Sequence, residues 1–402
     1  MSVSYGFLST FPPTQCGLAT FNQSLFQHLV TPLDRGGVVR VVDEPSTAPG
    51  PETVGHLVAG SRLSMLAAAA ALNRFDVAII QHEYGIYAGR DGDQVLDVLN
   101  RLRVPSIVVL HTVLSSPTPH QRFVLERVVE GADAVVVMSK TAATRLFDGY
   151  VIDASKVVAI AHGAPAFTEP TVPAMPADYA SFAAFTAYPA PRRPTILSWG
   201  LLGPGKGLEW AIDALAELRD LDPAPRYLIA GQTHPKVLER EGEAYRTSLM
   251  ERAAALGVDS MVQFDPNYRD SESLLRLVRE ADVVVLPYDS SEQATSGVLI
   301  EAVAALRPVV ATRFPHACEL LANGSGLLVE HRDPAGLAAA LRRVLTEPGL
   351  SERMSAAAAR ISPELAWPAI AEQYRELAAG LLAARATELV GVGVGAETGV
   401  AA

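Results

Sequence analysis

Thr295, Ser296 and Gly297 lie where the polar loop after a predicted buried strand, Ala281 to Leu286, leads into an apolar helix predicted over Ser296 to Leu306. The first N–H groups of a helix have no partner within the helix, and the helix dipole adds positive potential at the same place. We therefore expect this turn to hold a phosphate group.

Glu301 lies about one turn into the same predicted helix. A carboxylate repels a phosphate, so this side chain is better suited to accept hydrogen bonds from hydroxyl groups. A ribose would supply such hydroxyls. A diphosphate next to a ribose indicates a nucleotide sugar as the ligand.

A second loop, Gly200 to Gly207, has the sequence Gly-Leu-Leu-Gly-Pro-Gly-Lys-Gly and joins a predicted strand to a predicted helix. The backbone N–H groups around Gly205 and the ammonium group of Lys206 can converge on a diphosphate there. The alternative is that Lys206 is an ordinary surface lysine.

Further candidates follow other predicted strands of the sequence. Gly231 stands at a strand end, where a glycine permits close approach of a nucleotide, and Gly17 stands in the loop between the first strand and the first helix. His82, Glu83 and Tyr84 form a polar cluster after a buried strand, where an acceptor can bind. Ordinary loops and a structural hydrogen-bond network are the alternatives for these positions.

Strands and helices alternate along both halves of the chain, which predicts parallel sheets covered on both faces. Predicted strands cover residues 3–8, 38–42, 77–81, 106–111, 134–138, 157–161, 195–199, 226–230, 261–264, 281–286 and 309–312. Predicted helices cover residues 19–29, 62–72, 92–102, 121–130, 141–146, 207–219, 235–256, 271–280, 296–306 and 334–345. In such sheets ligands bind beyond the carboxyl ends of the strands.

Proline-rich sequence separates the two halves and predicts two domains with a cleft between them. The predicted organisation is a first α/β domain over 1–168, a linker over 169–194, a second α/β domain over 195–365 and a disordered tail over 388–402.

Composition excludes several classes of protein. The net charge of −11 argues against a nucleic-acid-binding surface, although it leaves room for a small basic patch in peripheral contact with a membrane. The two cysteines, Cys16 and Cys318, provide neither a disulfide framework nor metal-ligand spacing, so we expect reduced thiols, a cytoplasmic protein and no metal site. No signal peptide or transmembrane run is predicted.

The two-domain layout resembles the retaining glycosyltransferases of family 4, which have the GT-B fold of two Rossmann-like domains. Lys206 and Gly207 match a Lys-Gly pair of that family, whereas Leu201 stands where an arginine is usual. Either a cation from elsewhere, such as Arg269 or Arg90, replaces that arginine, or the donor is held less by charge. The family signature has two glutamates separated by seven residues. Here Glu301 is the second.

The first signature glutamate is replaced in this sequence. Gln293 occupies its position and Glu292 precedes it, and either could contact the hydroxyls of the donor sugar. The resemblance also implies that His111, at a strand end, contacts the sugar or the acceptor, and that a helix over 366–385 returns to the first domain. Gly17 would lie in the loop that faces both substrates.

The resemblance implies a retaining transfer of a sugar, in which a hexose is the expected group, from a nucleotide-diphosphate sugar to a hydroxyl acceptor such as a carbohydrate, with no further cofactor. Catalytic roles would fall to His111, Lys206 and either Glu292 or Gln293. A GT-B-like sugar phosphorylase, an epimerase of sugar nucleotides and a catalytically silent sugar-nucleotide-binding protein are the alternatives. A dehydrogenase is disfavoured because no Gly-x-Gly-x-x-Gly follows the first strand.

Overall fold

Two compact units make up the computed structural model of this chain. The structure describes residues 2–44, 50–166 and 192–395. The first unit comprises Met1–Gly163, Glu292–Gly297 and Trp367–Ala402, and the second comprises Ala164–Ser291 and Val298–Ala366. Residues 292–297, which the sequence analysis assigned to the second domain, thus group with the first unit. Most of the predicted linker, 169–194, lies outside the described residues.

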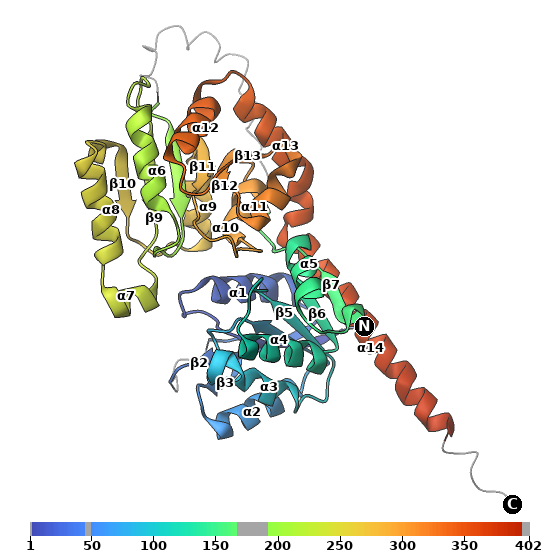
Figure 1. Cartoon of the computed structure of the whole chain (residues 1–402). Helices are drawn as coiled ribbons and strands as arrows, with labels where there is room; N and C mark the ends of the chain where they lie inside the picture. The colour runs from blue at the N-terminus through green and yellow to red at the C-terminus, as the bar shows by residue number, and fades with distance from the viewer. Residues whose placement is uncertain (1, 45–49, 167–191, 396–402) are drawn as a thin grey trace, which may run out of the picture. The chain divides into compact units, whose positions relative to one another are not determined.

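The first unit is built on a parallel sheet of seven strands in the order β3-β2-β1-β4-β5-β6-β7 (Figure 1). Its strands are β1 (Ser4–Ser9), β2 (Arg35–Val42), β3 (Thr53–Val58), β4 (Val77–His82), β5 (Ser106–Leu110), β6 (Ala134–Val137) and β7 (Val157–Ala159). The prediction missed β3, which lies at the edge of the sheet and contains a glycine and a histidine that weaken the strand pattern.

Helices cover both faces of this sheet. They are α1 (Gly17–Leu29), α2 (Arg62–Leu72), α3 (Gln94–Leu99), α4 (Pro119–Gly131), α5 (Lys140–Gly149) and α14 (Trp367–Gly395). Successive residues of a strand face opposite sides, so Leu8 packs in the core beneath α2 to α5, whereas Phe7 packs in the core beneath α1 and α14.

The final helix, α14, belongs to the core of the first unit. The ring of Trp367 lies 5.2 Å from that of Phe21, and Tyr374 is fully buried in the same cluster. The helix reaches Gly395, beyond residue 388, where the predicted tail begins. Isolated glycines weaken a helix without necessarily ending it. Residues 396–402 lie outside the described residues.

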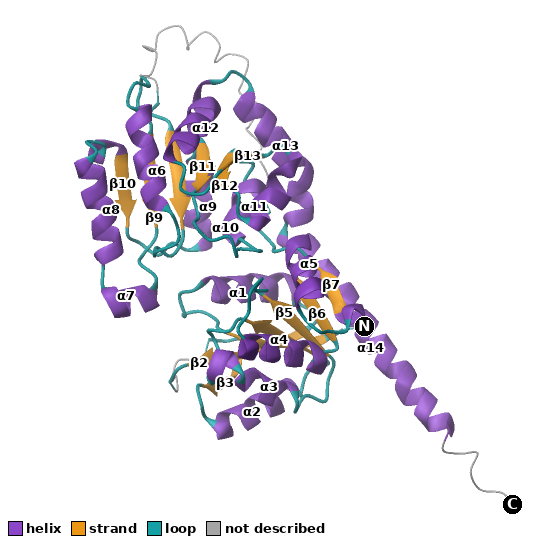
Figure 2. Cartoon of the chain, in the orientation of Figure 1, coloured by secondary structure: helices purple, strands orange, loops and turns teal. Residues whose placement is uncertain are grey.

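The second unit has its own parallel sheet of six strands, in the order β10-β9-β8-β11-β12-β13 (Figure 2). These strands are β8 (Thr195–Trp199), β9 (Arg226–Ala230), β10 (Val262–Asp265), β11 (Val283–Leu286), β12 (Val309–Thr312) and β13 (Gly326–Val329). The two parallel sheets with their helices confirm the predicted α/β class. The short edge strand β13 was not predicted, since it has only four residues and begins with glycine.

Within the described residues, eight α-helices surround or follow the strands of this sheet. They are α6 (Leu208–Leu215), α7 (Pro235–Glu241), α8 (Ala244–Ala255), α9 (Ser271–Glu280), α10 (Gly297–Ala304), α11 (Pro315–Leu320), α12 (Pro334–Thr346) and α13 (Leu350–Leu365). The single helix predicted over 235–256 is wrong. Gly242 has a positive φ of 60° and separates α7 from α8, because a left-handed residue cannot continue an α-helix.

Candidate functional site

In the first unit, the structure brings His82, Glu83, Tyr84 and His111 to the carboxyl edge of the sheet. Strands β4 and β5 pair in parallel, with His82 opposite Leu110. The N–H of His111 donates to the carbonyl of His82 at 3.0 Å, so the two strand ends are adjacent. Parallel strands deliver their following residues to one edge, as the sequence analysis expected.

His111 is held in one orientation. Its Nε2 lies 2.8 Å from Oε1 of Gln81, whose own amide donates to Asn22, so Nε2–H donates and Nδ1 is the acceptor of a neutral ring. Burial, together with smaller contributions from the neighbouring rings of His162 and His82, lowers the pKa of His111 to about 3. The neutral ring is therefore suited to accept a hydrogen bond from a hydroxyl group.

His82 has a different environment from the one expected of an acceptor-binding residue. Its side chain is fully buried, with its ring 5.2 Å from the ring of Tyr84. Neither ring nitrogen has a hydrogen-bond partner among the described residues. Glu83 and Tyr84 remain half-buried, and the hydroxyl of Thr112 donates to the carboxylate of Glu83. Of the three residues predicted to bind the acceptor substrate, His82 is thus the one whose side chain is too deeply buried to contact it.

The burial of His82 gives a testable pH dependence of stability. Desolvation lowers the pKa of His82 to about 4, below the ordinary value near 6.5 that applies in the unfolded chain. As pH falls from 7 to 5 the unfolded state gains a proton that the folded state does not. We expect His82 to contribute a loss of about 2 kcal/mol over this interval.

The matching variant is His82→Leu, which removes the titrating ring and leaves no donor or acceptor to satisfy. Chemical denaturation at pH 7 and pH 5 should show a smaller loss of unfolding free energy for the variant than for the wild type. Equal losses in the two proteins would contradict this assignment. His111 remains in both proteins and contributes in the same direction.

Gly17 begins α1 and faces open space. A Cβ atom added at this position would meet no other atom within 4 Å. Packing in the described structure therefore does not require a glycine here. The open space is compatible with a ligand that approaches the backbone closely.

The segment 292–297 is anchored to the first unit by polar contacts. The carboxylate of Glu292 accepts from the N–H of Ser115 at 3.0 Å and from its hydroxyl, and it lies 3.3 Å from NH1 of Arg145. The same guanidinium donates to the carbonyl of Glu292 at 2.7 Å. The hydroxyl of Ser139 donates to the carbonyl of Ala294 at 2.7 Å, and Ala294 is buried in the core. The carboxylate and the backbone carbonyl of Glu292 therefore both have partners within the protein.

The other predicted residues of this segment have lighter contacts. The side-chain amide of Gln293 donates to the carbonyl of Thr295 at 3.2 Å, and Gln293 is half-buried. Ser296 is buried just before α10. A Cβ at Gly297 would lie 2.8 Å from Nε2 of His162, so a larger residue here would displace that ring. Helix α10 starts at Gly297, one residue after the predicted start.

In the second unit, Lys206 stands in the loop between β8 and α6. Its Nζ lies 4.6 Å from the centre of the Tyr288 ring, a cation–π contact that fixes the ammonium group. The N–H of Asp289 donates to the carbonyl of Gly205 at 3.0 Å, which ties this loop to the loop after β11. Gly207 has a φ of 64°, and a Cβ there would lie 1.8 Å from the carbonyl oxygen of Pro287. The close contact between the two loops therefore requires a glycine.

Gly231 follows β9 and approaches the same loop. Its φ is 141°, and a Cβ at this position would lie 2.0 Å from the carbonyl oxygen of Gly200. The close backbone contact between these two strand ends accounts for this glycine without any ligand.

Glu301 lies in α10 beside the end of β8. Its carboxylate accepts a hydrogen bond from Nε1 of Trp199 at 3.1 Å. Burial raises the pKa of Glu301 to about 7, and the bond from Trp199 opposes this increase. The residue as a whole is half-buried.

The cations that could replace the usual arginine have other partners. Arg269 forms an ion pair with Asp265, with Nε 2.8 Å from the carboxylate. Arg90 belongs to the first unit, where its Nε lies 3.8 Å from Asp91. We therefore assign neither of them to a diphosphate.

Arg246 is a cation that the sequence analysis missed. It is 9% exposed, and it donates to the carbonyl of Gly231 at 3.0 Å and to Glu243 at 3.0 Å. Its NH1 is buried without a partner among the described residues. Only the fold brings α8 to the end of β9, so no motif in the sequence could have found it.

Two negative findings concern the part of the chain that the structure describes. Over residues 2–44, 50–166 and 192–395, no group of three or more His, Cys, Asp or Glu side chains is arranged to hold a metal ion. Of the helices in these ranges, none is both long and apolar enough to cross a membrane.

Sequence comparisons place the chain in a family. Residues 185–361 match the family model of glycosyl transferases group 1. The D-inositol 3-phosphate glycosyltransferase of Jonesia denitrificans is 30% identical over 307 residues, which cover 72% of this chain and 68% of that protein. The chain belongs to the group 1 glycosyl transferases. Another D-inositol 3-phosphate glycosyltransferase, from Corynebacterium efficiens, is 29% identical over 291 residues, and the match covers 68% of this chain and 65%, just under two thirds, of that protein.

The solved structures agree on the fold of this group 1 glycosyl transferase. HepE of Anabaena, solved in complex with UDP and glucose, superimposes with a TM-score of 0.71 at 18% identity, and the match covers 93% of this chain and 99% of HepE. The predicted GT-B fold is thereby confirmed.

Proposed function

We propose that this protein is a retaining glycosyltransferase that moves a sugar, with a hexose as the expected group, from a nucleotide-diphosphate sugar to an acceptor hydroxyl. The supporting observation is the pair of joined loops at the carboxyl edge of the second sheet. There the Lys206 loop is tied to the loop after β11, and Glu301 contacts Trp199 at the end of β8. Family membership supports the same function.

Each part of the donor has an assigned partner in this proposal. Glu301 accepts hydrogen bonds from the ribose hydroxyls. Lys206 and the backbone around Gly205 compensate the diphosphate charge, together with N–H groups of Thr295, Ser296 and Gly297. The backbone of Gly231, at the end of β9, lies beside the nucleotide in this proposal. Because HepE was solved with UDP bound, UDP is the first nucleotide to test.

The remaining predicted residues are assigned to the sugar and the acceptor. Gln293 contacts the hydroxyls of the donor sugar, and Nδ1 of His111 accepts from a sugar or acceptor hydroxyl. Gly17 leaves space for substrate at the start of α1. Glu83 and Tyr84 contact the acceptor, whereas buried His82 supports their loop.

The proposed chemistry needs no metal ion and no covalent nucleophile. The bond between the anomeric carbon and the diphosphate oxygen breaks, and the acceptor oxygen bonds to the same face of that carbon. The acceptor proton passes to the departing diphosphate, whose charge Lys206 stabilises. We propose carbohydrate biosynthesis in the cytoplasm as the setting, where Cys16 and Cys318 would stay reduced.

A panel of nucleotide sugars and nucleoside diphosphates tests this proposal. The correct donor should raise the melting temperature, since a ligand at about a hundredfold excess over its dissociation constant stabilises the folded state by about 2.7 kcal/mol. Product analysis with candidate acceptors, inositol phosphates among them, should then show transfer with retention. Donor binding without transfer or hydrolysis would instead indicate a catalytically silent binding protein. That alternative arises because Leu201 and Gln293 replace the usual arginine and glutamate of the family. Activity with free phosphate and no nucleotide would indicate a phosphorylase.

The roles of Gln293 and Glu292 can be separated. Gln293→Ala should lower the transfer rate about two- to tenfold, the value of one neutral hydrogen bond, while nucleoside diphosphate binding stays unchanged. If Glu292 only anchors the segment, Glu292→Gln and Arg145→Gln should have similar effects on transfer, because each removes one side of the same ion pair. A much larger loss for Glu292→Gln than for Arg145→Gln would mean that the carboxylate itself contacts the sugar.

A further inference from the structure

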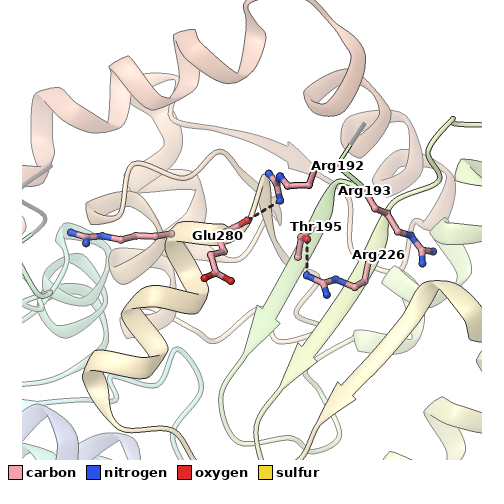
Figure 3. A pocket seen from close by; sticks show the side chains of 6 residues that line it. Arg192, Arg193, Thr195, Arg226 and Glu280 are labelled. Carbon is pink, nitrogen blue, oxygen red and sulfur yellow. Dashed lines mark hydrogen bonds between the residues drawn. The ribbon is translucent and has the colours of Figure 1, made fainter. Parts of the chain in front are cut away.

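A cavity of about 610 Å³ lies at the amino edge of the second sheet (Figure 3). Thr195 at the start of β8, Arg226 at the start of β9 and Glu280 at the end of α9 line it. Lys206 and Gly231 follow the carboxyl ends of β8 and β9. The cavity is therefore at the opposite edge of this sheet from the loops assigned to the donor.

The lining of this cavity is strongly cationic. Among the described residues, four of the six that line the cavity are arginines, namely Arg192, Arg193, Arg226 and Arg279, and Glu280 is the one carboxylate. Arg192 pairs with Asp282. It also donates to the backbone carbonyl of Glu280, a bond that Figure 3 shows. In a chain with a net charge of −11, this local excess of positive charge is unusual.

Neutral groups hold Arg193 in place. Its guanidinium donates to three backbone carbonyls, those of Ala224 at 2.7 Å, Ser260 at 3.2 Å and Pro225 at 3.2 Å. These bonds fix the position of the group, but a neutral acceptor does not cancel its charge. Among the described residues, Arg193 forms no ion pair with a carboxylate.

Arg226 is held in the same way. It donates to the hydroxyl of Thr195 at 3.1 Å, a bond visible in Figure 3, and to the side-chain carbonyl of Gln263 at 3.4 Å. Two guanidinium groups are thus positioned by neutral partners around one cavity. Guanidinium groups that are fixed in advance lose little side-chain entropy when an anion binds.

A further arginine raises the positive potential behind the cavity. Arg307 donates to the backbone carbonyls of Arg279 and Ala281 at 3.1 and 3.2 Å. Burial lowers the pKa of Arg307, the Asp282 carboxylate opposes this decrease, and the charge of Arg279 adds a smaller decrease. Arg307 thus places a further positive charge beside Arg279.

We infer that the arginine cavity binds a small anion that carries two or more phosphate groups. The planar guanidinium group donates two parallel hydrogen bonds to phosphate oxygens, which favours phosphate over other anions. Glu280 and Asp282 compensate two of the four lining arginines, and Arg307 adds a further positive charge behind the cavity. A single phosphate group, with a charge of about −1.5 to −2 at pH 7, would leave part of this excess uncompensated. The volume is in the range of small-molecule sites.

Tripolyphosphate is the probe for a direct test by calorimetry. The wild type should bind it, and the double variant Arg193→Gln/Arg226→Gln should bind it about tenfold more weakly or worse, because two charged hydrogen-bond donors are lost. The matched control is Arg342→Gln/Arg343→Gln, which makes the same charge change on α12 of the same unit and should bind normally. Lys206→Ala removes a cation of the donor loop, where the probe can also bind, but it should keep the binding event that the Arg193→Gln/Arg226→Gln variant loses, which separates the two sites.

Several outcomes would overturn the inference. They are an equal loss in the double variant and the α12 control, a loss in Lys206→Ala alone, or no binding by the wild type. Vesicles of phosphatidylglycerol form a second arm, and binding to them without binding of tripolyphosphate would indicate a lipid surface and contradict a small-molecule site.

A single variant allows the same test if the double variant does not fold. If circular dichroism shows that the double variant is not folded, Arg226→Gln, which gives up only two side-chain bonds, should still weaken binding about threefold or more. Unchanged binding in this folded variant would overturn the inference. No sugar transfer is measured in this test, so its result is independent of the proposed function.

Discussion

Replacing Lys206 with alanine should lower the rate of sugar transfer about tenfold or more, with each 1.36 kcal/mol of lost transition-state stabilisation corresponding to a factor of ten. The ammonium group is fixed over the ring of Tyr288 and stands in a loop tied to Asp289. Leu201 provides no second cation and Arg269 pairs with Asp265. More of the compensation of the diphosphate charge therefore falls on Lys206.

Calorimetry with two ligands checks this assignment. The Lys206→Ala variant should bind nucleoside diphosphate more weakly than the wild type and should bind the free nucleoside, which has no phosphate, equally well. Lys236→Ala removes a lysine of the same unit outside this loop and should leave both affinities unchanged. If Lys206→Ala weakens both ligands to the same extent, Lys206 has a structural role and the diphosphate assignment fails.

Replacing Glu301 with alanine should weaken nucleotide binding by about 1.5–3 kcal/mol, the usual value of a hydrogen bond to a charged group. The free nucleoside should lose the same free energy, because the ribose hydroxyls are the proposed donors. This result distinguishes Glu301 from Lys206, whose loss should spare the nucleoside. Unchanged affinity for both ligands in a folded Glu301→Ala variant would remove Glu301 from the site.

The pH dependence of nucleoside binding offers a second test of Glu301. Burial raises its pKa to about 7, so the carboxylate is ionised above this pH and protonated below it. The ribose hydroxyls donate hydrogen bonds to the ionised carboxylate. The affinity of the protein for the nucleoside should therefore fall as pH is lowered from 8 to 6. In Glu301→Gln the affinity should be flat over this range. The same slope in both proteins would show that another group titrates.

The strands and the main loops of this fold could be predicted from sequence because their signals are local. Apolar runs gave the central strands, and glycines beside Lys206 gave the loop that the structure places after β8. The edge strand β3 carries no such run, because Gly55 and His56 interrupt it. The break between α7 and α8 depends on the backbone conformation of Gly242, which a helical pattern of side chains does not reveal.

The contacts that define the candidate site were less accessible to sequence reasoning. Glu292 and Ser115 are separated by 177 positions in the chain, and no sequence motif predicts the hydrogen bonds between them. The sequence left Glu292 and Gln293 as equal candidates, and the anchoring of Glu292 is what favours Gln293 as the sugar contact. Arg246 and the arginine cavity likewise depend on which elements become neighbours in the sheet.

The position of α14 in the core of the first unit has a consequence for the synthesis of this protein on the ribosome. Domains made first usually fold first. Here Phe7 and Phe21 are translated long before Trp367 and Tyr374, which pack in the same core. By then the strands of the second unit have all been made. The nascent first unit must therefore leave the part of its sheet that α14 covers exposed until α14 has been made. A chain that is released before then would be prone to aggregate through that apolar surface.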